Sequence, residues 1–133
     1  MIYLDHAAAT PLDPKVLKEM QPFFSEAFFN PSAPYAPAIE VRKQYEAAKS
    51  KIAQAIGGKA DELIITAGAT ESINLAINSI GGHIITANIE HHAVLEATKK
   101  HDHTTISADS KGIVSADAIA NAITGNTRLI SIA

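Results

Sequence analysis

Residues 66–72, Thr-Ala-Gly-Ala-Thr-Glu-Ser, are the segment whose residue types and spacing best suit chemistry. A short apolar run leads into small residues, and we expect a helix to begin at Ala69. Small residues let a ligand approach the backbone, a helix N-terminus offers unpaired N–H groups at its positive end, and the Thr70 hydroxyl is a further donor. The segment therefore indicates phosphate binding. The alternative is an ordinary cap, in which Thr70 or Ser72 hydrogen-bonds to its own helix.

Two adjacent histidines follow the next apolar run, in residues 90–94, Glu-His-His-Ala-Val. His91 is placed to stack on a planar ligand or to transfer a proton near neutral pH. The alternative is an exposed histidine that caps a helix. A metal site would combine His91 or His92 with His101 and His103. Neighbouring helical histidines diverge, however, and no carboxylate stands at the spacing of known zinc motifs, so we expect no metal.

Small residues also adjoin polar ones in two earlier segments. Residues 5–11 read Asp-His-Ala-Ala-Ala-Thr-Pro, and residues 30–32 read Asn-Pro-Ser. Such clusters allow a substrate to approach closely, but a packed arm and a turn account for them equally well.

The rest of the first half predicts helices. Asp13-Pro14 predicts a helix start with Asp13 as N-cap, and Pro22 should bend or shorten that helix. Apolar residues at helical spacing over 39–56 predict a long helix that Gly57-Gly58 ends. Residues 1–12 are expected to form an extended arm.

From residue 63 onward, short apolar runs alternate with helical patterns. We expect strands at 63–66, 83–86, 104–107 and 128–132, and helices at 69–79, 92–100 and 115–123. Buried strands separated by helices favour a largely parallel sheet with right-handed crossovers. In such a sheet ligands bind beyond the carboxyl ends of the strands. Because the sequence stops one residue past an apolar strand, we expect the front part of a longer domain.

Composition excludes several classes of protein. The 133 residues contain no cysteine and carry a formal net charge of −3, with 11 Lys+Arg against 14 Asp+Glu. No disulfide scaffold, thiolate metal site or cysteine nucleophile is therefore available within the chain. The basic residues form no cluster, so no nucleic acid partner is expected. No apolar run approaches the roughly 18–20 residues that span a bilayer, so we expect no membrane association and a cytoplasmic location.

Taken together, the motifs resemble a known family. Residues 3–11, 30–32, 66–76 and 90–94 look like the amino-terminal third of a cysteine desulfurase of the NifS/IscS kind, and their order and spacing match over nearly the whole chain. These are class V, fold-type I enzymes. The resemblance implies an α/β fold with the three-layer, mostly parallel sheet of the aspartate aminotransferase-like large domain. That domain would be incomplete here, with an arm at residues 1–12 and the amino-terminal portion of the large domain at 13–133.

The resemblance also implies a cofactor and its binding residues. The cofactor would be pyridoxal 5'-phosphate, with Ala69 and Thr70 at the positions that hold its phosphate. His91 would be the catalytic histidine that stacks over the pyridine ring and assists proton transfer. Asn30 and Ser32 would lie in a loop at the mouth of the active site, and Asn74 would stabilise the phosphate turn.

Some family features are missing or changed. The places where the family's Asn-Pro-Ser loop usually continues to a histidine and a glycine are Tyr35 and Ala38, which leaves the substrate contacts open. The Schiff-base lysine, the aspartate on the pyridine nitrogen and the catalytic cysteine have no counterpart. We therefore expect a truncation or one half of a split enzyme, inactive by itself.

By resemblance, the complete enzyme converts L-cysteine to L-alanine and enzyme-bound persulfide sulfur for iron-sulfur cluster biogenesis. Its partners would be a sulfur-acceptor protein and either a second copy in a homodimer or a complementary chain. Three alternatives remain open: another class V enzyme, namely a selenocysteine lyase or a small-amino-acid aminotransferase; a non-catalytic binding or assembly module; and a histidine metal site.

Overall fold

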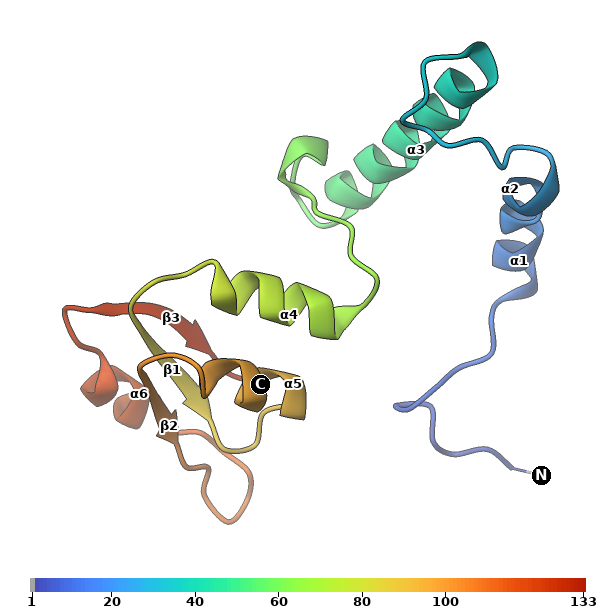
Figure 1. The fold of residues 1–133 in the computed structure, drawn as a ribbon. Coiled ribbons are helices and arrows are strands. Elements are labelled where there is room, and N and C mark those ends of the chain that lie inside the picture. Colours follow the sequence, from blue (N-terminus) through green and yellow to red (C-terminus); the bar gives the residue numbers. More distant parts are fainter. Residues whose placement is uncertain (1) are drawn as a thin grey trace. The chain divides into compact units, whose positions relative to one another are not determined.

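The computed structural model describes residues 2–133, and Figure 1 shows their helices and strands. The chain divides into two compact units. The first unit ends at Ile64, and the second runs from Ile65 to Ala133. No helix within the described residues is long and apolar enough to cross a membrane.

The first helices of the chain are set by two prolines. Helix α1 (Pro14–Met20) begins as predicted, because Asp13 Oδ1 accepts the N–H of Lys15 at 2.7 Å and Pro14 occupies a position whose N–H needs no partner. Pro22 starts the short helix α2 (Pro22–Ser25). The predicted interruption at Pro22 is therefore confirmed.

Helix α3 (Ala36–Ala55) is the long helix expected from the apolar periodicity. It ends where Gly57 takes a φ of 76°, a left-handed conformation that favours glycine, and a 3-10 turn, η1 (Ala60–Glu62), follows. Of its twenty residues, only Ala38 and Ala53 are buried.

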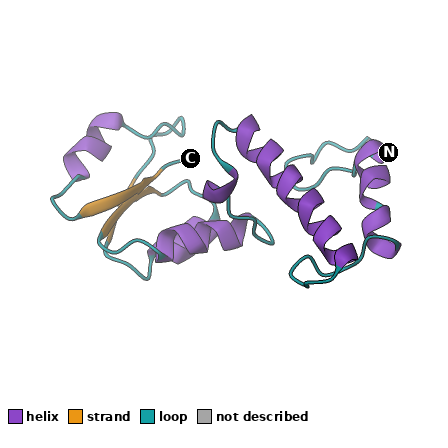
Figure 2. Ribbon diagram, turned by 90° about the horizontal axis from the view of Figure 1, so that it is seen from above, coloured by secondary structure: helices purple, strands orange, loops and turns teal. Residues whose placement is uncertain are grey.

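The second unit alternates helices and strands. Its elements are α4 (Ala69–Asn78), β1 (His83–Ala87), α5 (His92–Thr98), β2 (His103–Ile106), α6 (Ala116–Ala122) and β3 (Thr127–Ser131). Strands are orange and helices purple in Figure 2. The three strands form one parallel sheet in the order β2-β1-β3. This arrangement confirms the expected α/β class with a parallel sheet.

Strand β1 is the buried centre of the second unit. All five of its residues are buried, so both faces of the sheet are covered there. On one face, Ile84 packs with Ile77 of α4 and with Val94 and Ala97 of α5. Helices α4 and α5 thus cover that face, and their N-terminal ends contribute to a common cleft.

His83 ties the three strands together at the start of β1. The residue is only 5% exposed, and its two ring nitrogens lie 2.9 Å from hydroxyls on the two neighbouring strands: Nδ1 from Thr127 Oγ1 and Nε2 from Thr104 Oγ1. Both polar atoms of a buried ring are therefore satisfied within the sheet.

Gly82 gives the chain its turn into β1. Its φ is 109°, and a Cβ built on it would lie 2.8 Å from both Asn126 O and Arg128 Cγ. Asn126 O accepts the N–H of His83 at 2.9 Å, and this hydrogen bond holds Asn126 O close to Gly82. Only glycine fits this position without strain.

The strand predicted at residues 63–66 is absent. These residues form no strand, and the sheet of the described residues has three members. A four-residue apolar run becomes a strand only when a neighbouring strand takes up its N–H and C=O groups, and here none does. The segment leads instead directly into the turn before α4.

Candidate active site

The N-terminus of α4 has no side-chain cap. Gly68 occupies the N-cap position, and no hydrogen bond among the described residues uses the N–H of Gly68, Ala69 or Thr70. The Thr70 hydroxyl is likewise without a partner there. The capping alternative for Thr70 and Ser72 is wrong, because neither side chain accepts an N–H at the start of α4. The Ser72 hydroxyl contacts Thr66 Oγ1 at 2.6 Å and donates to Gly68 O at 3.5 Å. Three N–H groups and one hydroxyl remain available to an anion.

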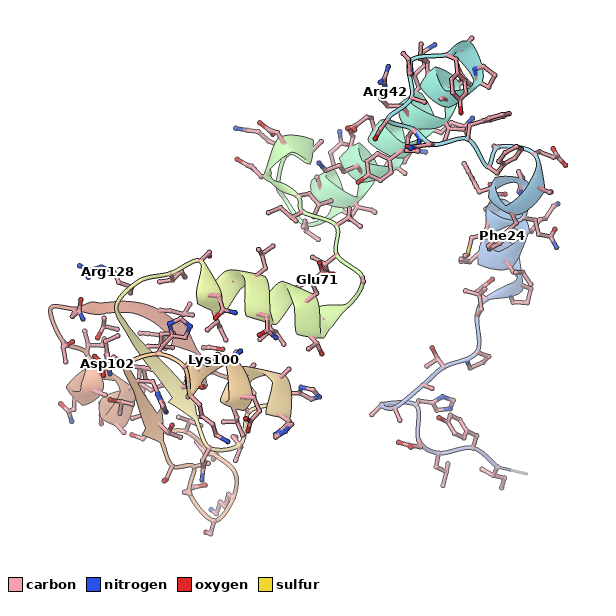
Figure 3. All side chains as sticks on the ribbon, in the orientation of Figure 1. Phe24, Arg42, Glu71, Lys100, Asp102 and Arg128 are labelled. Atoms are coloured by element: carbon pink, nitrogen blue, oxygen red, sulfur yellow. The ribbon has the colours of Figure 1, made fainter. Side chains whose placement is uncertain are left out.

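Side chains of the first helical turn fix the loop that precedes it. Glu71 Oε2 accepts the N–H of Ala67 at 2.6 Å, and Figure 3 shows the Glu71 side chain at the N-terminal end of α4. Asn74 donates its side-chain N–H to Thr70 O at 2.9 Å. This hydrogen bond lies within α4, and the expected role of Asn74 toward the phosphate turn stays a prediction.

The turn opens onto a cleft within the second unit. A cleft of about 730 Å³ is lined by residues 67–71, Asn74 and His91. A neighbouring cleft of about 490 Å³ extends from the same Thr70, Asn74 and His91 along α5 to Lys100. Thr70 and His91, which the sequence predicted as site residues from two separate motifs, thus line one concave surface.

His91 is both the N-cap of α5 and a wall of this cleft. Its Nδ1 accepts the N–H of Ala93 at 3.1 Å, so the predicted capping role is present. A nitrogen that accepts a hydrogen bond carries no proton, and the proton of the neutral ring is therefore on Nε2. The cap fixes the orientation and the tautomer of the His91 ring, and the same residue also lines the cleft.

The adjacent His92 lines the 490 Å³ cleft but not the 730 Å³ cleft at the turn. Its side chain is 81% exposed, and its Nδ1 lies 3.8 Å from Glu96 Oε1. The hydrogen bond that Lys99 donates to Glu96 is the largest effect and lowers the pKa of that carboxyl. Desolvation opposes it, and the weaker charge interactions with Lys99, His92 and Lys100 lower the pKa further. His92, Glu96 and Lys99 thus form a solvated charged surface on α5, and His92 and Glu96 also line the 490 Å³ cleft.

Asn30 and Ser32 lie in the first unit. Asn30 Oδ1 accepts the N–H of Ser32 at 2.9 Å, which closes a local turn. The structure gives these residues a turn geometry, and their role toward a substrate stays a prediction.

Sequence reasoning missed the role of Glu71. An acidic residue three positions after the N-cap of an expected helix is the signature of a capping box, and that signal was present in the sequence.

For a metal, residues 2–133 contain no group of three or more His, Asp or Glu side chains arranged to hold an ion.

Comparison with known proteins defines the class. The chain matches the model of the aminotransferase class-V family over residues 2–133, and it belongs to that family. It is similar to the cysteine desulfurase IscS of Dictyoglomus turgidum (strain DSM 6724 / Z-1310), with 43% identity over 98% of this chain and 36% of that protein. It is also similar to the cysteine desulfurase IscS of Rickettsia bellii (strain OSU 85-389), with 40% identity over 98% of this chain and 35% of that protein.

Solved structures agree with this family. A structure described as SspA in complex with cysteine superposes with a TM-score of 0.92 and 37% identity, over 98% of this chain and 41% of that one. A NifS-like protein gives a TM-score of 0.90 and 33% identity, over 98% of this chain and 39% of that one. The expected fold-type I class is thereby confirmed. The chain spans only about a third of the length of the curated relatives.

Proposed function

We propose that this chain is the amino-terminal part of a pyridoxal-phosphate-dependent cysteine desulfurase. One observation carries the proposal: the uncapped N-terminus of α4 and the ring of His91 line the same cleft. The similarity to curated cysteine desulfurases, and to a protein solved in complex with cysteine, supports L-cysteine as the substrate.

The residues present fit the cofactor that class V enzymes use. The phosphate of pyridoxal 5'-phosphate is an anion that needs several N–H or O–H donors, and Gly68, Ala69 and Thr70 offer three free N–H groups and a hydroxyl. The planar ring needs a flat neighbour, which His91 supplies. Once bound, the cofactor would withdraw electrons from the bonds at the α carbon of the amino acid.

His91 would orient the reactants and hold a proton at one defined atom. Because Ala93 N–H occupies Nδ1, the proton available for transfer is on Nε2. The helix cap also holds the ring in one orientation, which lowers the cost of positioning it against a planar ligand.

The remaining chemistry needs residues that this sequence lacks. The overall reaction transfers the sulfur of L-cysteine to an enzyme thiol, giving L-alanine and a persulfide, and these 133 residues contain no cysteine. The thiol and the cofactor-binding lysine would be supplied by the rest of the protein or by a complementary chain. A homodimer, a sulfur-acceptor protein, a role in iron-sulfur cluster biogenesis and a cytoplasmic location belong to the same proposal.

Residues 13–133 would then form the amino-terminal portion of the large domain, with residues 1–12 as an arm. Asn30 and Ser32 would line the mouth of the active site. These assignments rest on the resemblance of their motifs and on the family match over residues 2–133.

The test is to combine this chain with a chain carrying the remaining residues and to assay sulfide release from L-cysteine. We expect activity from the mixture and none from either chain alone. Selenide release from selenocysteine in preference to sulfide, or amino transfer, would reassign the enzyme within class V. Strong desulfurase activity of the isolated chain, or a failure of the mixture to take up pyridoxal phosphate, would overturn the proposal.

A further inference from the structure

The hydrogen bond from Ala67 N–H to Glu71 Oε2, which we call the Glu71 clasp, closes the turn before α4 in an unusual register. In a capping box, the acidic residue at the third helical position accepts the N–H of the N-cap residue itself. Here the N-cap is Gly68, and the carboxylate reaches one residue further back, to Ala67, at 2.6 Å. The N–H of Gly68 is therefore left free.

A second contact supports the same turn. Thr66 Oγ1 lies 2.6 Å from Ser72 Oγ and donates to Gly68 O at 3.2 Å. Together with the Glu71 clasp, it ties residues 66 and 67 to residues 71 and 72. The three residues between these ties keep their N–H groups unused. The hydrogen bonds that close the turn therefore do not use the N–H groups of Gly68, Ala69 and Thr70.

The charge of Glu71 opposes the function that the turn is proposed to have. The residue lines the cleft together with Gly68, Ala69 and Thr70, so its carboxylate is a negative group beside a site for an anion. A carboxylate there repels a phosphate, and the benefit must come from the hydrogen bond. A neutral side chain with an acceptor oxygen at the same place would serve equally well.

We propose that Glu71 is a positioning residue that holds the phosphate turn in its binding conformation through its acceptor oxygen. The inference rests on the proposed function, because it concerns the same anion site. Without the clasp, Ala67 and Gly68 gain backbone freedom, and binding must then order them.

The experiment compares the wild-type chain with Glu71→Ala and Glu71→Gln. Gln keeps an oxygen that can accept the Ala67 N–H, but it has no charge. Amide hydrogen exchange of Ala67 reports the clasp without any ligand, and the exchange of β1 amides reports whether the fold is retained. Titration with pyridoxal phosphate, and separately with inorganic phosphate, is followed by the amide signals of Gly68, Ala69 and Thr70.

We expect Glu71→Ala to speed exchange at Ala67 and to weaken binding of both probes about tenfold, with β1 protection unchanged. Glu71→Gln should restore both quantities to the wild-type level or better. If Glu71→Ala binds as tightly as wild type, or if Glu71→Gln is as weak as Glu71→Ala, the positioning role is wrong. If the wild-type chain binds neither probe, both the proposed phosphate site and the role of Glu71 are wrong. If the wild-type chain binds the probes but the variants do not differ from it as expected, only the role of Glu71 is wrong.

Discussion

Thr70 in the first turn of α4 and His91 at the N-cap of α5 line one cleft, although different elements carry them. One residue offers hydrogen-bond donors suited to an anion, and the other offers a planar ring with a proton on a defined nitrogen. Helices α4 and α5 bring them together by packing side by side on the same face of β1. The site therefore depends on the helix packing as much as on either motif.

Replacing Thr70 with Ala should weaken binding of the cofactor phosphate. The change removes one hydroxyl donor to a charged group, a loss of about 1.5–3 kcal/mol, or roughly 10- to 150-fold in affinity. Thr70→Ser keeps the hydroxyl and should bind within a few-fold of wild type. The measurement is a spectral titration of the completed enzyme with pyridoxal phosphate. Equal affinities for the Ala and Ser variants would contradict a role for this hydroxyl.

His91 can be tested with a variant that separates capping from ring chemistry. Asn is a good N-cap residue, so His91→Asn should preserve α5 while removing the ring. We expect both His91→Asn and His91→Ala to slow turnover of the completed enzyme by about 10²-fold or more, with cofactor still bound. His92, which neither caps α5 nor lines the 730 Å³ cleft, offers the control, because His92→Ala should leave turnover within a few-fold. Wild-type turnover of His91→Asn would show that the residue serves only as a cap.

His83 should contribute strongly to the stability of the second unit. His83→Ala removes two side-chain hydrogen bonds and leaves a cavity among buried groups, so we expect a loss of about 2–4 kcal/mol in the free energy of unfolding. Urea unfolding followed by circular dichroism measures this difference. His92→Ala, at an exposed position, should change the same quantity by less than about 0.5 kcal/mol.

Two adjacent glycines should respond differently to the same substitution. Gly82→Ala forces a side chain into a positive-φ conformation and against Asn126 O, so we expect a loss of about 1–3 kcal/mol. A Cβ at Gly81 meets no atom within 4 Å, and Gly81→Ala should be nearly neutral. Thermal unfolding of the two variants gives the comparison. Similar melting temperatures for both would mean that the turn adapts without cost.

The pKa of Glu96 should make a small, acid-side contribution to the pH dependence of stability. Its pKa in the folded chain lies below the ordinary value of 4.5, mainly because Lys99 donates a hydrogen bond to it. The stabilisation is therefore complete above about pH 4.5 and is lost as the pH falls through the folded pKa. An NMR titration of the Glu96 carboxyl carbon checks the shift. Lys99→Ala should raise the pKa toward 4.5, and an unchanged value would contradict the assigned cause.

Local features of the fold could be predicted from the sequence because their causes lie within a few residues. Asp13 caps the helix that starts at Pro14, and Gly57 ends α3 in a left-handed conformation, as their types required. The three strands of the second unit were predicted from short apolar runs, although only β1 is buried throughout and β2 and β3 are at most half-buried. The helix at Ala69 was likewise correct.

Other features depended on distant partners and could not be predicted in the same way. The apolar run at 63–66 looked like the other strands, but whether it pairs is decided elsewhere in the chain. The contacts of His83 depend on the register of two neighbouring strands.

At the site, the types of Thr70 and His91 indicated their chemistry. The choice between cap and ligand site needed geometry: Gly68 rather than Thr70 is the N-cap, whereas His91 is a cap and a cleft residue at once.

The central position of β1 has a consequence for how the protein is made. Strand β1 needs β2 on one edge and β3 on the other, and the hydroxyl that Thr127 offers to His83 comes 44 positions later in the chain. On the ribosome, β1 therefore emerges long before its second edge can be closed. Until β3 has left the exit tunnel, the nascent chain can pair β1 only with β2, and the other edge of this most buried strand stays open.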